Sequence, residues 1–359
     1  MEIYIIVSLF VIVIGLIIFS FYNRKNNKIA YKMLIDILNL EEKMEIVKPF
    51  VKWAGGKNSL IPQLTKYYPF ELKNGTIERY IEPFVGGGAV LIDILQKYEV
   101  KEAYAFDINK DLINCYNVIK TNVENLIQEL DKKEKEFLIL DNDARQQYFY
   151  DIRAEYNSYT LNEDIDVKRA SEFIFLNRTC FNGLYRVNKD GKFNVPCGKY
   201  KNPTICDSNN LRNLSNLIKN VTFEYGDYKK SESFVNENTF VYFDPPYRPL
   251  SITSGFTSYT KEDFNDDNQK ELANYFYKLD LKNAKLMLSN SNPKNVNKDD
   301  NFFENIYKGF VINEVSAKRM INANAKGRGE ISELLITNYE EQSKWESQKN
   351  STMKMIALA

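Results

Sequence analysis

The fold of this chain is decided by residues 79–107, which read RYIEPFVGGGAVLIDILQKYEVKEAYAFD. Residues 79–84 are predicted to form a short strand. The three glycines after this strand are predicted to form a tight loop. Residues 89–97 have the pattern of a helix, and residues 102–107 that of a second strand ending in an acid. Strand, glycine loop, helix, strand and acid in this order are typical of the βαβ unit of a doubly wound, Rossmann-like α/β sheet.

The rest of the chain supplies the remaining elements of such a sheet. A helix is predicted at 263–279, and further strands at 221–225, 239–243, 285–289, 310–315 and 331–337. Residues 121–176 are rich in helix, and 180–203 contain a hairpin-like pair of runs around Asp190-Gly191. We therefore expect the sheet to be built from residues 48–120 and 221–340, with a helical and hairpin domain inserted at 121–220. Residues 23–47 are expected to be a linker and 341–359 a polar tail.

Composition limits the chemistry that the chain can perform. Its 359 residues correspond to about two domains. The 48 Lys and Arg residues balance 48 Asp and Glu residues, so any surface for nucleic acid must be local. The chain has no histidine, which excludes Ser-His-Asp hydrolysis and His-ligated metals, and we expect no metal site. The four cysteines form no CxxC pair and are expected to be reduced, as in a cytoplasmic protein.

The first residues raise the question of a membrane anchor. Residues 3–22 read IYIIVSLFVIVIGLIIFSFY, an uncharged run that would span about 30 Å as a helix. Arg24 and Lys25 follow, so the positive-inside rule predicts a single anchor with a cytoplasmic catalytic domain. A buried core helix is one alternative. Another is translation from Met33 or Met44, in which case the run at 3–22 is not part of the protein.

A DPPY turn, Asp244 to Tyr247, follows the apolar run 240–243. Two prolines end a central strand because they cannot donate to its ladder. An acid, a free carbonyl and an aromatic ring are therefore expected at the carboxyl end of a strand, where open α/β sheets bind ligands. Asp244 and the carbonyl of Pro245 can accept the two N–H groups of a planar amine while Tyr247 stacks on its ring. The alternative is a rigid turn in which the acid is a local cap.

The glycine loop, Gly86-Gly87-Gly88, lets backbone N–H groups approach a ligand at a helix N-terminus. Asp107 ends the next strand, where an acid can bind ribose hydroxyls. Together they indicate a nucleoside cofactor, although a glycine triplet alone is often a plain turn. The loop is not GxxxxGK[ST], which argues against a P-loop.

A basic and aromatic segment lies at residues 178–203. Asp190 is its only acid, and its basic residues are Arg178, Arg186, Lys189, Lys192, Lys199 and Lys201. Phe181, Tyr185, Phe193 and Tyr200 lie between them. In a neutral protein this pattern is typical of phosphate contact and base wedging, with a solvated charged loop as the alternative.

These motifs, in this order, resemble those of the Dam-type DNA adenine-N6 methyltransferases (D12 class, group alpha). The resemblance covers residues 48–340 and rests on FVKWAGGK at 50–57, EPFVGGG at 82–88, NRTCFNGLYRVNKDGKFNVPCG at 177–198, and DPPY. It implies S-adenosyl-L-methionine as cofactor, bound by Trp53, Lys57, Asp107, Asp244 and the glycine loop. Asp244, Pro245 and Tyr247 match the catalytic positions that hold the target adenine. Ser289-Asn290-Ser291 resembles a further motif near the adenine pocket.

The same resemblance implies double-stranded DNA as substrate and residues 121–220 as the target-recognition domain. The positions that read the bases of GATC are matched by Lys52, Leu184, Arg186 and Pro196. Phe181 and Asn182 match residues that enter the duplex beside the flipped base. A cognate restriction endonuclease is a possible partner. Two alternatives stay open: methylation of another planar amine, such as cytosine N4 or an RNA base, and a catalytically inactive, membrane-tethered DNA-binding protein.

Overall fold

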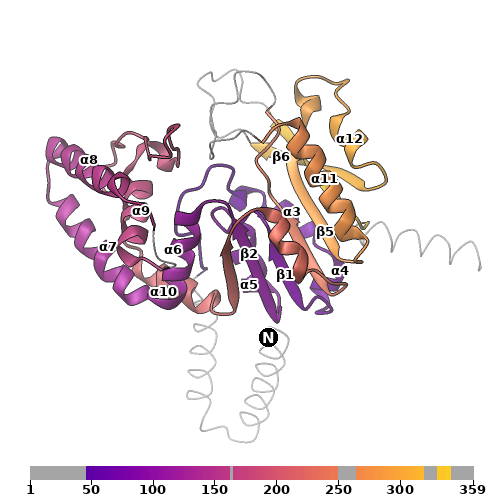
Figure 1. Cartoon of the computed structure of the whole chain (residues 1–359), viewed down its shortest axis with the longest axis horizontal. Helices are drawn as coiled ribbons and strands as arrows, with labels where there is room; N and C mark the ends of the chain where they lie inside the picture. The colour runs from indigo at the N-terminus through magenta and orange to yellow at the C-terminus, as the bar shows by residue number, and fades with distance from the viewer. Residues whose placement is uncertain (1–45, 162–164, 250–263, 319–329, 341–359) are drawn as a thin grey trace, which may run out of the picture.

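The computed structural model describes residues 46–161, 165–249, 264–318 and 330–340 (Figure 1). The expected anchor at 3–22, nearly all of the expected linker and the tail at 341–359 lie outside these ranges. Within them, no helix combines the length and the apolar character needed to cross a membrane.

Seven strands form one sheet in the order β3-β2-β1-β4-β5-β7-β6. Strands β1 to β5 are parallel, whereas β7 is antiparallel to both of its neighbours. The strand order reverses at β1, which pairs with β2 on one side and β4 on the other, as in a doubly wound sheet. This confirms the predicted fold class. The strands are β1 (Arg79–Glu82), β2 (Glu102–Asp107), β3 (Val221–Tyr225), β4 (Thr239–Phe243), β5 (Lys285–Ser291), β6 (Val311–Lys318) and β7 (Glu330–Thr337).

Both faces of the sheet are buried, which explains why its central strands read as continuous apolar runs. Tyr80 of β1 belongs to one hydrophobic cluster and the next residue, Ile81, to the other. The first cluster also contains residues of α3 (Ile61–Tyr67), α4 (Phe70–Lys73), α5 (Ala89–Lys97) and α6 (Lys110–Thr121). The second contains residues of α11 (Asp266–Asp280) and α12 (Phe302–Ile306). Short 3-10 turns are η1 (Lys57–Ser59), η2 (Phe181–Gly183), η3 (Tyr228–Phe234) and η5 (Pro293–Asn295).

Four helices between β2 and β3 extend the first cluster away from the sheet, to the left in Figure 1. They are α7 (Val123–Leu138), α8 (Asn142–Ser158), α9 (Val167–Thr179) and α10 (Ser208–Leu217). Helix α9 contributes Phe173 and Phe175 to the cluster that also contains Tyr80 of the sheet. Apolar packing is therefore continuous from the sheet into the inserted helices.

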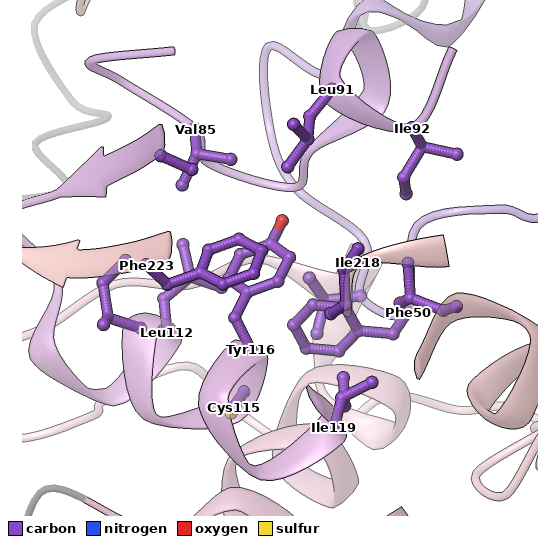
Figure 2. Close-up of a cluster of buried hydrophobic side chains, with 14 of the residues drawn as sticks. Phe50, Val85, Leu91, Ile92, Leu112, Cys115, Tyr116, Ile119, Ile218 and Phe223 are labelled. Carbon is purple, nitrogen blue, oxygen red and sulfur yellow. The ribbon is translucent and has the colours of Figure 1, made fainter. Parts of the chain in front are cut away.

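Tyr116 of α6 links this core to the glycine loop. Its ring stacks on Phe223 of β3 at 4.5 Å and meets Phe50 edge-on at 5.0 Å (Figure 2). Its hydroxyl leaves the cluster and donates to the carbonyl of Gly86 at 2.9 Å. The buried side chain of Tyr116 thus supports the glycine loop from the side of the hydrophobic core.

Several predicted elements differ in extent, and two of the differences have a clear physical reason. Strand β1 ends at Glu82 and not at residue 84, because Pro83 has no N–H to donate to the ladder. The hairpin at 180–203 is held by two isolated antiparallel bridges, Cys180 with Cys197 and Val187 with Phe193, and forms no continuous strands. Pro196, between the bridges, likewise lacks an N–H for a ladder.

Candidate functional site

The ends of β1 and β4 bring the glycine loop and the DPPY turn to the same edge of the sheet. The two strands are parallel neighbours, with Ile81 opposite Val241. The loop follows β1 directly, and Asp244 is the first residue after β4. Because β1 is also the strand at which the order reverses, this edge is where doubly wound sheets generally bind their ligands.

The glycine loop is packed too tightly for side chains. Gly86 and Gly88 have φ values of 47° and 70°, and a Cβ atom on Gly88 would lie 2.5 Å from the Tyr116 hydroxyl oxygen. A Cβ on Gly86 would lie 2.9 Å from Cδ1 and Nε1 of Trp53. The structure therefore brings together two of the predicted cofactor-binding segments, the loop and the residues around Trp53.

Asp107 fastens the glycine loop to β2. One of its carboxylate oxygens accepts from the backbone N–H of Gly86 at 3.0 Å and the other from that of Asn109 at 2.8 Å. Burial raises the pKa of Asp107 to about 6, and the two N–H donors partly oppose that shift. The Asp107 carboxylate is thus already oriented by the glycine loop. A nucleoside would bind beside this loop.

Lys57 and Asp244 form the charged centre of the site. Lys57 is only 3% exposed, and its Nζ lies 2.8 Å from Oδ1 of Asp244 and 2.7 Å from the carbonyl oxygen of Gly55. The same Nζ lies 4.7 Å from the centre of the Tyr247 ring, a cation–π contact. Burial raises the pKa of Asp244, and the charge of Lys57 opposes the rise.

Tyr247 is held at its far end by β7. Its hydroxyl donates to Oε2 of Glu333 at 2.6 Å. Burial, with Asp244 and Glu333 nearby, raises the pKa of Tyr247 well above its ordinary value, so the ring stays neutral. Sequence reasoning missed Glu333 because nothing in its neighbourhood along the chain marks it.

Glu82 is a second acid that sequence reasoning did not assign to the site. It is 2% exposed at the end of β1, and the Tyr80 hydroxyl donates to it at 3.0 Å. Burial raises the pKa of Glu82 well above its ordinary value, and the negative charge of Asp244 adds to the rise. The sequence signal that could have identified Glu82 is its place at the end of a strand, directly before Pro83 and the glycine loop.

The predicted DNA-contacting residues form an exposed surface. Phe181 is 53% exposed and its backbone N–H donates to the carbonyl of Pro196 at 2.9 Å, so these residues are neighbours. Asn182 is exposed with φ 56°, and exposed Arg186 donates from Nε to Asn194 Oδ1 at 2.8 Å. Leu184 differs because it is half-buried against the core.

Lys52 joins this surface through Asn177. The Asn177 side chain accepts from the Lys52 N–H and donates to the Lys52 carbonyl, both at 2.8 Å, and also donates to the Gly183 carbonyl at 3.0 Å. The next residue, Trp53, stacks on Tyr185 with ring centres 5.6 Å apart. The candidate DNA surface and the candidate cofactor site are therefore contiguous. Among the described residues, no cluster of acids and cysteines is arranged to hold a metal ion.

Comparisons with known proteins agree with this arrangement. The family model of the D12 class N6 adenine-specific DNA methyltransferases matches residues 53–321. The chain is 54% identical over 294 residues to the Type II methyltransferase M.MjaIII of Methanocaldococcus jannaschii, covering 82% of this chain and 99% of that protein. It is 37% identical to the Type II methyltransferase M1.LlaDCHI of Lactococcus lactis, covering 84% and 99%. It is 31% identical to the DNA adenine methylase of Escherichia coli, covering 80% and 94%.

Proposed function

Because this chain belongs to the D12 class of N6 adenine-specific DNA methyltransferases, we propose that it transfers a methyl group from S-adenosyl-L-methionine to adenine N6 in GATC. The adenine is flipped out of the duplex, because the amino group is not reachable for in-line transfer inside the stack. The observation that carries the proposal is the placement of Asp244, half-buried beside Lys57 at the strand end adjoining the glycine loop.

The residues at this edge fit the cofactor chemically. Asp107 offers a carboxylate for ribose hydroxyls, and the glycine loop, in which Gly86 is partly exposed, lies directly before α5. Lys57 places a positive charge beside Asp244 at this edge, and Trp53 lies against the loop. When bound, S-adenosyl-L-methionine supplies an electrophilic methyl group.

Asp244 and Pro245 activate the adenine amine. The N6 lone pair is delocalised into the purine ring, so the free amine is a poor nucleophile. Acceptors at the Asp244 carboxylate and the Pro245 carbonyl draw the nitrogen towards sp3 geometry and aim its lone pair at the methyl carbon. In the proposed transfer, the N6–C bond would form as the C–S bond of the donor breaks, the neutral thioether would be the leaving group, and the proton lost from N6 would pass to water. Positioning and electrostatics dominate such a transfer, and no covalent enzyme intermediate is needed.

Tyr247 and the exposed recognition surface hold the DNA. The Tyr247 ring stacks on the flipped base, while Phe181 and Asn182 occupy the gap near the flip site. Lys52, Leu184, Arg186 and Pro196 read the four base pairs. We also propose that residues 121–220 act as the target-recognition domain and residues 48–120 with 221–340 as the catalytic domain.

The decisive test is product identity. The purified protein is incubated with labelled S-adenosyl-L-methionine and either a GATC duplex or a matched GTTC duplex, and the nucleosides are analysed by mass spectrometry. We expect N6-methyladenine from the first duplex only. N4-methylcytosine, or label on both duplexes, would contradict the adenine target or the GATC assignment respectively.

Arg186→Ala is expected to relax specificity at one base pair by about 1–3 kcal/mol. The measurement is kcat/KM on duplexes with each GATC position changed in turn. Lys189→Ala on the same segment is the control, since an exposed lysine contacting phosphate would weaken all duplexes alike. An unchanged site preference in the Arg186 variant would remove Arg186 from the base-reading set.

Donor binding is expected to weaken below pH 6. The pKa of Asp107 is raised to about 6, so the ionised carboxylate is lost as the pH falls through that value. The dissociation constant of S-adenosyl-L-methionine should rise about tenfold by pH 5 relative to pH 7.5. Calorimetric titration measures this, with Asp107→Asn as the control that binds weakly but with a flatter pH dependence. A constant affinity of the unmodified protein between pH 5 and 7.5 would argue against an ionised Asp107 in the site.

The names of two relatives support a further proposal about the partner. Both M.MjaIII and M1.LlaDCHI are Type II methyltransferases. We propose by extension that this chain protects DNA against a cognate restriction endonuclease. The expected result is that duplexes methylated by the protein resist endonucleases that cut unmethylated GATC.

A further inference from the structure

Two buried amide side chains connect the backbone on either side of Tyr247. The Gln269 side chain of α11 donates from Nε2 to the Pro246 carbonyl at 3.0 Å. Its Oε1 accepts from Nδ2 of Asn290, on β5, at 3.0 Å. The Oδ1 of Asn290 in turn accepts from the backbone N–H of Arg248 at 3.1 Å. Gln269 and Asn290 are both 0% exposed, so the hydrogen bond between them is shielded from water, and the two bonds to the backbone of the turn are partly buried.

This chain of amides has a fixed direction. Each amide donates through its nitrogen and accepts through its oxygen, so the order of donors and acceptors from Arg248 to Pro246 is fully specified. The carbonyl of Pro246 and the N–H of Arg248 are thereby both occupied. Among the described residues, the carbonyl of Pro245 receives no hydrogen bond from the protein, which leaves it available to a substrate amine.

The side chain of Arg248 anchors the same loop from outside. Its guanidinium donates to both carboxylate oxygens of Asp266, at 2.7 and 3.0 Å, and to Asp300 at 2.8 Å. Its Cζ atom lies 4.2 Å from the ring centre of Phe302. The Arg248 carbonyl accepts from the Ser291 hydroxyl at 2.7 Å. Main chain and side chain of Arg248 are thus both restrained.

We propose that Gln269 is a positioning residue for methyl transfer. It fixes the peptide between Pro246 and Tyr247, so that the Pro245 carbonyl and the Tyr247 ring contact the adenine at the same time. This inference rests on the proposed function of the DPPY turn. A loop with two successive prolines has few N–H groups of its own for hydrogen bonding, so neighbouring side chains must determine its conformation. A misplacement of about 1 Å at a reacting group can lower a rate about a hundredfold.

The test compares Gln269→Glu and Gln269→Leu with the unmodified full-length protein at pH 8. An ionised glutamate keeps the acceptor for Asn290 but has no donor for the Pro246 carbonyl, whereas leucine loses both contacts. We expect kcat on a GATC duplex to fall about 10- to 100-fold in both variants. The KM for S-adenosyl-L-methionine and the Kd for duplex are expected to stay within about threefold, because neither ligand contacts Gln269 in the proposal.

Gln96→Leu is the matched control. Gln96 also makes partly buried amide hydrogen bonds, to the backbone of Val47 and Ile92, but it lies at the end of α5 that is remote from the glycine loop. We expect it to lower the melting temperature without lowering kcat. A Gln269 variant that loses stability yet keeps kcat within twofold would overturn the proposal, as would a rise in KM or Kd with kcat unchanged.

Arg248→Met covers the case in which neither Gln269 variant folds. It removes the contacts to Asp266 and Asp300, whose side chains are 48% and 25% exposed and so remain hydrated. We expect kcat about tenfold lower with the KM for donor unchanged, and an unaltered kcat would overturn the proposal. If the unmodified protein produced no N6-methyladenine in DNA, that result would contradict the proposed function itself. If the unmodified protein and the variants were equally active, only the role of Gln269 would be contradicted.

Discussion

Asp244→Ala is expected to lower methyl transfer at least about 1,000-fold while leaving the affinity for duplex DNA within about threefold. The substitution removes the carboxylate proposed to polarise the adenine amine, and the loss of one preorganised hydrogen-bonding group at a reacting centre costs about 10²–10³ in rate. It also removes the partner of Lys57, which is 3% exposed, so the remaining charge repels the developing positive charge on N6. In the proposed function, DNA affinity depends on the exposed recognition surface, so we expect it not to change.

The measurement is single-turnover transfer of labelled methyl, alongside fluorescence anisotropy with a labelled GATC duplex. Asp141→Ala is a suitable control, because Asp141 caps α8 through the N–H of Ala144 and lies outside the site. Both variants are compared at a temperature where circular dichroism shows them folded. Transfer by the Asp244 variant within tenfold of the unmodified protein would refute the assignment of Asp244.

The sheet could be predicted because its strands are marked at both ends. The residues of β4 are apolar without alternation, as expected for a strand buried on both faces, and two prolines mark where it stops. The predicted strand 221–225 coincides with β3 for the same reason: burial and turn residues set its limits. These signals are local, so they can be read without knowing which strands are neighbours.

The contacts within the site could not be predicted, because they join residues that are distant along the chain. Lysine is almost never fully buried without a partner, and only the fold reveals that Lys57 lies against Asp244. Tyr247 and Glu333 are 86 positions apart, and Gln269 reaches Pro246 across 23. The residue types at the site were recognisable from motifs, but the residues that hold them in place carry no motif of their own.

Arg169→Ala is expected to reduce the free energy of unfolding by about 3–5 kcal/mol. Arg169 of α9 pairs with both carboxylate oxygens of Asp111 on α6, at 2.7 and 2.9 Å, and its Cζ lies 3.8 Å from the centre of the Tyr156 ring. It also donates to the carbonyl of Tyr159 at 2.8 Å. The Arg169 side chain is 7% exposed and that of Asp111 is 16% exposed, so the loss of Arg169 removes the counter-charge of a largely buried carboxylate, which among the described residues keeps only the Tyr156 hydroxyl as a side-chain donor.

Arg212→Ala is the control for Arg169→Ala. It shows how much stability is lost when a bidentate ion pair is removed from an exposed position. Arg212 of α10 pairs with both oxygens of Glu124 on α7, but the two side chains are 45% and 60% exposed, so we expect a loss of at most about 1 kcal/mol. Urea unfolding measures both variants. Equal losses would show that burial is not what makes the Arg169 pair important. The Arg169–Asp111 pair joins α9 to α6, and the hydrophobic core continues from these helices to the sheet, so we expect the inserted helices and the sheet to unfold together in a single transition.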